Sequence, residues 1–120
     1  MAKLFVYGTL RQKECRHYLL GTSHFLGYGR AKGFLLYNIG SFPGMIKGAG
    51  EVKGEVYEIP DELLDKLDMV EGVPYLFRRE VIEVELKDGT LIKAYAYLYN
   101  KKVDNKMLIP SGDWKDVAKF

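Results

Sequence analysis

The amino-acid sequence predicts an α+β fold that is mostly β, with a closed or nearly closed sheet, one clear helix and one weaker helix. Glycines recur through residues 23–58 between aromatic and branched residues, which favours short, bent strands with bulges and turns. Residues 77–86 and 91–100 have the alternating pattern of half-buried strands. Residues 60–71 alone have the apolar spacing of a well-formed amphipathic helix. Small barrels of this kind hold one small ligand at the mouth.

The first elements follow from local patterns. Lys3–Tyr7 is an apolar, β-rich run that predicts a strand, and Gly8 ends it. Arg11–Leu20 predicts a short helix with Gly21 as its terminator. Within the glycine-rich part, Val52–Ile59 alternates clearly enough to predict a strand.

The clearest helix begins at Pro60, a residue that suits the first helical position. Asp61 and Glu62 follow at the positive end of the helix dipole. Gly72 and Pro74 end the helix. Its expected buried stripe consists of Leu63, Leu64 and Leu67.

A hairpin is expected after this helix. The strand Phe77–Leu86 runs into the turn Lys87–Thr90, where Asp-Gly is a strong hairpin signal. The returning strand, Leu91–Asn100, places three tyrosines on one face and smaller apolar residues on the other. From residue 101 the chain is polar and irregular, with a turn expected at residues 111–114.

Length and composition indicate one small domain, residues 1–120, that forms a soluble globular fold: 48% of the residues are hydrophobic and 28% charged. A net charge of +2 without a basic stripe disfavours nucleic acid as a partner. Cys15 is the single cysteine, so no disulfide can form within the chain. No signal peptide or membrane span is apparent, so we expect a cytoplasmic location. A single glutamine and few asparagines favour a thermophilic source.

Glu71 is the most informative residue. It follows Leu67 by four positions and Leu64 by seven, so it continues the apolar stripe of the helix. Burial, together with the negative end of the helix dipole, raises the pKa of such a carboxyl, as a general acid and base requires. The competing interpretation is that the helix frays by Met69 and Glu71 points to solvent. The residues alone leave these two interpretations balanced.

Tyr7-Gly8-Thr9-Leu10-Arg11 is the second candidate feature. A strand that ends at glycine and turns can aim several backbone N–H groups into one concavity, which suits a carboxylate or a developing oxyanion. Thr9 adds a hydroxyl and Arg11 a positive charge. Most strand–glycine turns are only turns, so this segment by itself is a weak signal.

Other constellations predict less. Cys15, His17 and His24 match no zinc spacing and lack a fourth ligand, so no metal site is expected. No glycine spacing for a nucleotide site is present. The row Tyr95, Tyr97 and Tyr99 is expected to pack on a sheet face, with lining of the pocket as the alternative.

Taken in order, these motifs resemble the γ-glutamyl cyclotransferase-like superfamily over nearly the whole chain. The segments that carry the resemblance are Tyr7–Leu10 (Tyr-Gly-Thr-Leu), Ser41–Met45, Leu67–Pro74 (Leu-Asp-x-x-Glu-Gly-x-Pro), Arg79, Ala94–Tyr99 and Gly112–Trp114. The Glu-Gly-x-Pro form is most similar to the γ-glutamylamine cyclotransferase branch. The ordered set is more specific than any one of its motifs.

The resemblance implies a small mixed β-barrel flanked by helices, with a cavity at one end. It implies a reaction in which the α-amine of a γ-glutamyl group attacks its own γ-carbonyl and releases 5-oxoproline and a free amine. Glu71 would be the acid/base, and Tyr7, Gly8, Thr9 and Leu10 would bind substrate. The expected partner is a small γ-glutamyl amine or peptide, and the reaction would need no cofactor.

One departure concerns substrate choice. Phe77 stands where related sequences often carry tyrosine, and Tyr75 would point to the same face and compensate. Arg11, Tyr75 and Phe77 are therefore candidate pocket residues. The alternative function is a non-catalytic binding module for a γ-glutamyl or carboxylate ligand on the same fold, in which Glu71 could stay ionised or exposed. A protein-interaction domain with a vestigial pocket is a third hypothesis, and it predicts that Glu71 tolerates replacement.

Overall fold

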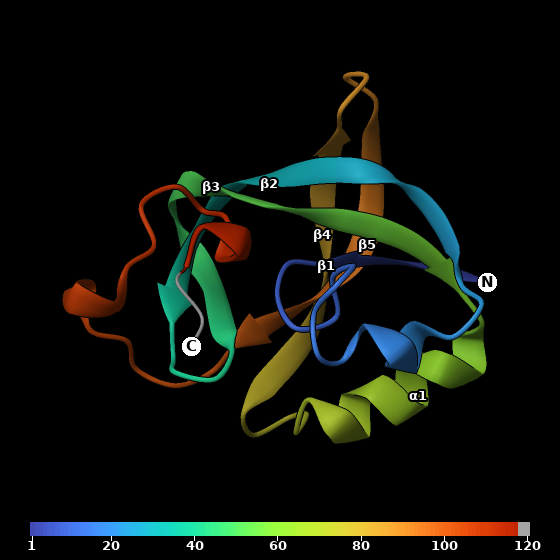
Figure 1. Cartoon of the computed structure of the whole chain (residues 1–120), viewed down its shortest axis with the longest axis horizontal. Coiled ribbons are helices and arrows are strands. Elements are labelled where there is room, and N and C mark those ends of the chain that lie inside the picture. Colours follow the sequence, from blue (N-terminus) through green and yellow to red (C-terminus); the bar gives the residue numbers. More distant parts are fainter. Residues whose placement is uncertain (118–120) are drawn as a thin grey trace.

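Five strands close into a barrel in a computed structural model that describes residues 1–117 (Figure 1). The strands are β1 (Ala2–Val6), β2 (His24–Asn38), β3 (Pro43–Ile59), β4 (Phe77–Leu86) and β5 (Leu91–Tyr99). Around the barrel their order is β1-β3-β2-β4-β5. One α-helix, α1 (Asp61–Val70), and three 3-10 helices, His17–Leu20, Asn105–Met107 and Trp114–Asp116, complete the described elements. The predicted α+β barrel is confirmed.

The sheet is mixed because its closure differs from its other pairings. Four neighbouring pairs are antiparallel, whereas β1 meets β5 in parallel, with Leu4 opposite Tyr95. The predicted hairpin of β4 and β5 forms with Glu85 opposite Leu91. Figure 1 shows this hairpin projecting at one end of the barrel, while the start of β4 lies beside the end of α1.

The glycine-rich segment forms two long strands, β2 and β3, and not the several short ones that the sequence predicted. Bulges between Phe25 and Gly27 and between Lys32 and Phe34 bend the pair without ending it. A glycine also permits close packing on the inner side: a Cβ at Gly54 would lie 2.3 Å from the carbonyl oxygen of Val6. Long strands that bend at such points can wrap around a small barrel.

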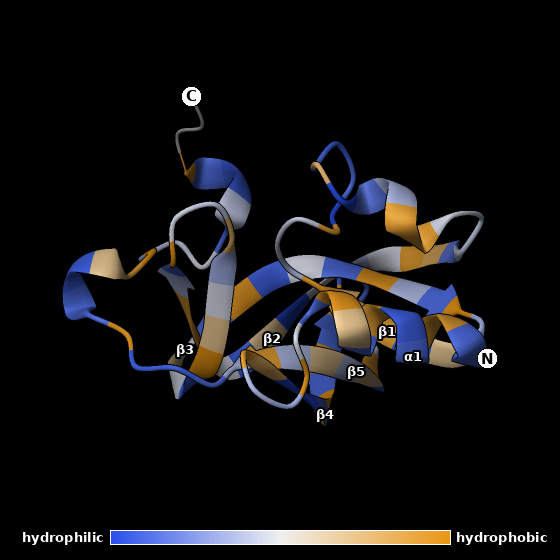
Figure 2. Cartoon of the chain, turned by 90° about the horizontal axis from the view of Figure 1, so that it is seen from below, coloured by the Kyte–Doolittle hydropathy of each residue, from blue (hydrophilic) through white to orange (hydrophobic). Residues whose placement is uncertain are grey.

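Alternation along β5 divides its side chains between two hydrophobic clusters. One cluster contains Leu64 and Leu67, so it lies between the strands and α1; the other gathers the opposite faces of the same strands. The tyrosines of β5 pack in the first, and Ala94, Ala96 and Leu98 in the second. The predicted faces of this strand are therefore confirmed. Figure 2 shows the hydrophobic and hydrophilic segments interleaved along the strands and α1.

Helix α1 differs from the prediction by one residue, because Pro60 is its N-cap in extended conformation. Asp61 and Glu62 occupy the first turn, and Leu64 and Leu67 are buried, as expected. Leu63 is only partly buried.

The predicted helix over residues 11–20 is wrong except for its last turn. Turns occupy residues 11–16, and only His17–Leu20 forms a 3-10 helix, which ends at Gly21. Lys13 has φ of +67°, a left-handed conformation that interrupts a helix. Cys15 lies on these turns and is exposed.

The segment after β5 returns to the barrel through a turn at Gly112. Gly112 has φ of +68° and accepts a hydrogen bond from the Lys53 N–H at 2.8 Å. The predicted turn over residues 111–114 is thus confirmed and leads into the 3-10 helix Trp114–Asp116. Over residues 1–117 no helix has the length and apolar character needed to cross a membrane.

Candidate active site

Glu71 lies at the junction between α1 and the following turn. It is the C-cap residue, with φ of −84° and ψ of 0°, and its N–H donates to the Leu67 carbonyl at 2.8 Å. Gly72 then takes φ of +66°, a left-handed conformation that favours glycine and turns the chain away. The helix therefore does not fray before Glu71, and its end holds the side chain against the barrel.

A cavity of about 110 Å³ lies where this helix end meets the barrel. Its walls come from the end of β1 and the loop after it, the start of β3, the end of α1, the start of β4 and the middle of β5. The residues that line it are Phe5, Val6, Tyr7, Gly8, Thr9, Leu10, Arg16, Phe42, Pro43, Val70, Glu71, Leu76, Phe77 and Tyr97. Segments far apart in the sequence thus meet around one carboxyl group.

Burial makes the Glu71 carboxyl hard to ionise. It raises the pKa of Glu71 from 4.5 to about 7, while the positive charge of Arg16 acts in the opposite direction. At neutral pH this carboxyl is therefore close to half protonated. A group in that condition can both accept and return a proton.

Residues 7–10 form another part of the cavity wall. A Cβ at Gly8 would lie 2.6 Å from Pro43 Cγ, so the loop can pack this closely only with glycine at that position. The Gly8 and Thr9 carbonyls accept hydrogen bonds from the N–H groups of Arg11 (3.0 Å) and Arg16 (2.9 Å). By contrast, the N–H groups of Gly8, Thr9 and Leu10 donate to no protein group within residues 1–117. The loop thus has amide donors that are not committed elsewhere.

Tyr7 fixes the start of this loop. Its hydroxyl donates to the Tyr97 carbonyl at 2.5 Å and accepts from the Met45 N–H at 3.3 Å. Burial, with the negative charge of Glu71 as a second cause, raises the pKa of the Tyr7 phenol above its ordinary value. Tyr7 therefore stays protonated and holds β1, β3 and β5 together beside the cavity.

Asp68, one turn before Glu71, is committed to structural contacts. It accepts from the Tyr97 hydroxyl at 2.7 Å and pairs with Arg79 at 2.9 Å. The Arg79 guanidinium also lies over the Tyr95 ring, 5.0 Å from its centroid. These contacts join α1 to β4 and β5, and they leave Glu71 as the acid that lines the cavity.

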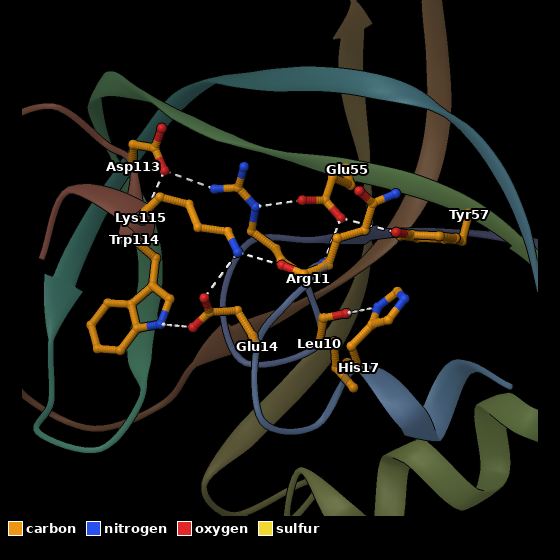
Figure 3. Close-up of polar contacts among 10 residues, drawn as sticks. Leu10, Arg11, Glu14, His17, Glu55, Tyr57, Asp113, Trp114 and Lys115 are labelled. Atoms are coloured by element: carbon orange, nitrogen blue, oxygen red, sulfur yellow. Dashed lines mark hydrogen bonds and ion pairs between the residues drawn. The ribbon is translucent and has the colours of Figure 1, made fainter. Parts of the chain in front are cut away.

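Arg11, a candidate pocket residue, lies outside this cavity in a buried polar network (Figure 3). Its guanidinium pairs with Glu55 and with Asp113, both at 2.8 Å. Glu55, which is 1% exposed, also accepts from the Gln12 N–H and the Tyr57 hydroxyl, each at 2.9 Å. Every polar atom of the buried carboxylate is thus engaged.

The C-terminal 3-10 helix closes this network from the other side. Trp114 Nε1 donates to Glu14 at 3.0 Å, and Lys115 pairs with Glu14 at 2.9 Å and donates to the Gln12 carbonyl (Figure 3). Residues 11–14, just after the cavity loop, are therefore anchored to β3 and to the end of the described chain. No local pattern predicts this role for Glu55, because Arg11 and Gln12 lie 44 and 43 positions away from it in the sequence.

The other two candidate pocket residues take different positions. Phe77 lines the cavity, and its ring centroid lies 5.9 Å from that of Phe42 and 5.4 Å from that of Tyr99. Tyr75 is 79% exposed and does not line the cavity. Sequence reasoning also missed Arg16, which does line it.

Metal-ligating residues do not cluster in the described part of the chain, where no group of three His, Cys, Asp or Glu side chains could hold an ion. His17 Nδ1 lies 2.9 Å from the Leu10 carbonyl and so supports the cavity loop.

Comparison with known proteins places this arrangement in a family. Residues 4–116 match the family described as "Gamma-glutamyl cyclotransferase, AIG2-like". The chain belongs to this family. Among relatives, a Vibrio cholerae protein named provisionally as a gamma-glutamylcyclotransferase is 41% identical over 112 residues, which cover 92% of this chain and 93% of the relative. The gamma-glutamylcyclotransferase family protein YtfP of Escherichia coli K12 is 34% identical over 114 residues, 95% of this chain and 96% of the relative.

Solved structures agree with this membership. The protein PH0828 of Pyrococcus horikoshii superposes with a TM-score of 0.79 at 32% identity, covering 97% of this chain and 92% of that one. An AIG2-like protein of Mus musculus superposes with a TM-score of 0.80 at 26% identity, covering 94% and 87% respectively. The barrel and its cavity are thus set in a fold that this family shares.

Proposed function

We propose that this protein is a cyclotransferase that acts on γ-glutamyl amines, releasing 5-oxoproline and a free amine, with Glu71 as the general acid and base. The observation that carries the proposal is the position of the Glu71 carboxyl, partly buried against a cavity and with a pKa of about 7. A module that only binds its ligand would not need a carboxyl that titrates near neutrality, so this pKa favours catalysis over binding. Family membership supports the same reaction class.

The first step begins with proton removal. The substrate α-amine is an ammonium at neutral pH, and the ionised Glu71 carboxylate accepts one of its protons. The freed amine nitrogen then forms a bond to the γ-carbonyl carbon, whose oxygen takes the electron pair and becomes negative. The protonated Glu71 next gives its proton to the departing nitrogen as the carbon–nitrogen bond breaks. The ring nitrogen still carries one proton more than the lactam, and the Glu71 carboxylate removes it as the carbonyl re-forms and passes it to the released amine. The products are the neutral 5-oxoproline lactam ring and an ammonium, and Glu71 returns to its ionised form.

The negative charge that develops on the γ-oxygen needs donors. Gly8, Thr9 and Leu10 line the cavity, and their N–H groups have no partner in the described residues. Backbone amides held rigidly in a water-poor site stabilise an oxyanion well because they need no reorganisation during the reaction. The contacts of Tyr7 and of Arg11 on either side hold this loop in position.

The size of the cavity suits this reaction. Its volume of about 110 Å³ is smaller than the ~300–1,000 Å³ of pockets that enclose drug-sized ligands. We expect it to hold only the glutamyl head, while the amine that leaves extends toward the mouth. Nucleophile and electrophile belong to one molecule, so the protein has mainly to fold the substrate on itself. No atom changes its oxidation state, and the reaction consumes no co-reactant.

We place the enzyme in the cytoplasm, where an exposed thiol such as Cys15 stays reduced.

The test is a substrate panel of γ-glutamyl amines, γ-glutamyl amino acids and γ-glutamyl-ε-lysine, with 5-oxoproline and free amine both measured. We expect equal amounts of the two products from at least one substrate. Glu71→Gln should lower this rate by about 10²–10⁴-fold, because glutamine keeps the shape of the side chain but cannot act as a base. Glu62→Gln, the same change at an exposed position of α1, is the matched control and should keep full activity. The absence of product from every substrate, or equal rates for both variants, would refute the proposal.

A further inference from the structure

Arg16 is a second charged side chain at the cavity, and the proton transfers proposed above do not use it. It lines the same cavity as Glu71 and caps the 3-10 helix His17–Leu20. Its N–H donates to the Thr9 carbonyl at 2.9 Å, which holds the residue beside the loop of uncommitted amides. Among the described residues, Glu71 and Arg16 are the only acidic or basic side chains that line this cavity.

Arg16 is also unlike the other arginines of the chain. Arg11, Arg30, Arg78 and Arg79 all form ion pairs with carboxylates. The side chain of Arg16 is exposed and forms no ion pair or hydrogen bond with any residue in the range 1–117. Its guanidinium is therefore available to an incoming anion, and a guanidinium binds a carboxylate with two parallel hydrogen bonds.

The charges of the cavity match those of an amino-acid head group. A γ-glutamyl substrate has an ammonium and a carboxylate on the same α-carbon, and Glu71 must contact the ammonium if it is the base. We propose that Arg16 binds the α-carboxylate of the substrate and so makes that group a requirement for turnover. This inference rests on the proposed function and adds to it a residue that selects γ-glutamyl amides over amides that lack the carboxylate.

The distance between the two charged groups is consistent with this role. No direct ion pair joins Arg16 and Glu71 in the described structure, yet the positive charge of Arg16 lowers the pKa of Glu71. The guanidinium thus lies beyond ion-pair range of the Glu71 carboxyl, yet close enough to act on it through space. A zwitterionic head group between them would satisfy both charges.

Steady-state kinetics of Arg16→Met and Arg16→Lys test the proposal, with 5-oxoproline release as the readout. We expect Arg16→Met to lower kcat/KM by about 10- to 100-fold, mainly through KM, because it removes hydrogen bonds to a charged group. Arg16→Lys should lower kcat/KM less than Arg16→Met does, because lysine keeps the positive charge but cannot form the paired hydrogen bonds of a guanidinium. Arg30→Met, which removes an exposed arginine of β2 outside the cavity, is the matched control and should stay within twofold of the native enzyme.

Two lactams give a second readout. 5-Oxoproline carries the carboxylate, and 2-pyrrolidinone is the same ring without it. We expect 5-oxoproline to inhibit the native enzyme more strongly, and Arg16→Met to be inhibited equally by both compounds. The acidic limb of kcat/KM should also move to higher pH in Arg16→Met, because the positive charge of Arg16 lowers the pKa of Glu71 in the native enzyme. Tyr7 and Tyr97, the other titratable groups at the cavity, stay protonated and do not contribute to this limb.

Three results would overturn the inference. They are equal inhibition of the native enzyme by both lactams, a change of less than twofold in kcat/KM for Arg16→Met, and an equal loss in Arg16→Met and Arg30→Met. Failure of the proposed function would appear differently, as the absence of 5-oxoproline from the native enzyme itself.

Discussion

At the residue scale, the proposed reaction depends on one carboxyl group that the fold keeps partly buried at a cost in stability. Glu71 continues the apolar stripe of α1, and its side chain lies against a cavity whose other walls are largely apolar. Burial opposes the ionised form and raises its pKa from 4.5 to about 7. Sites that tune a group in this way commonly sacrifice stability for chemistry.

Glu71→Gln should therefore stabilise the protein in a pH-dependent manner. The pKa of the native carboxyl is higher in the folded state, so its favourable contribution is complete below about 4.5 and is lost as pH rises through about 7. We expect Glu71→Gln to exceed the native free energy of unfolding by about 2–3 kcal/mol at pH 8, and by much less at pH 4.5. Urea denaturation at both pH values checks this. A difference that does not change with pH would mean that Glu71 ionises freely in the folded state.

Some site residues could be predicted from sequence and others could not. Glu71 was found because helical spacing is local and places it on the same face as Leu64 and Leu67. The N–H groups near Gly8 were found because a strand that ends at glycine is also a local pattern. Arg11 was assigned to the pocket, yet its partners Glu55 and Asp113 turn it away. Partners this distant in sequence leave no local pattern.

At the element scale, the cavity loop is held by contacts on both sides. Tyr7 fixes its start through the Tyr97 carbonyl, and Arg11 fixes its end through Glu55. Because the loop itself is built of turns, these anchors define its shape. The expected helix over residues 11–20 fails for the same reason: long-range ion pairs outweigh a weak helical propensity.

Arg11→Met should strongly destabilise the protein. It leaves Glu55, which is 1% exposed, as a buried charge without its cation, and loss of one partner of a buried pair costs about 3–5 kcal/mol. The double variant Arg11→Met/Glu55→Met removes both charges and should be more stable than Arg11→Met alone. Chemical denaturation of the native protein, Arg11→Met, Glu55→Met and the double variant measures this coupling. Additive costs would show that the pair does not act as a unit.

Gly112→Ala tests the turn that returns the C-terminal segment to the barrel. A Cβ at Gly112 would lie 1.9 Å from the Glu51 carbonyl oxygen, and φ is +68°. We expect a loss of more than about 2 kcal/mol, because both the clash and the left-handed conformation oppose alanine. Gly89→Ala is the control: its φ is +90°, nothing lies near its Cβ, and it should cost about 1 kcal/mol. Equal costs at the two positions would exclude the clash as the cause.

At the scale of the whole molecule, barrel closure builds the site. The parallel contact of β1 with β5 brings the loop after β1 and Tyr97 together, and α1 spans the outer face so that its end reaches the same point. The alternation of apolar and polar residues along single strands predicted a sheet, and the glycines of residues 23–58 predicted that its strands bend. The order of the strands could not be predicted from these patterns, because each pairing depends on residues far apart in the chain.

The most direct test of the central claim is the pH dependence of kcat/KM for 5-oxoproline release by the native enzyme. We expect kcat/KM to fall about tenfold for each pH unit below an apparent pKa near 7, since only ionised Glu71 can accept the ammonium proton. Tyr7 and Tyr97 also line the cavity, but burial raises the pKa of each phenol, so both stay protonated in this range. An acidic limb near 4.5, or one that persists unchanged in Glu71→Gln, would contradict the assignment of Glu71 as the base.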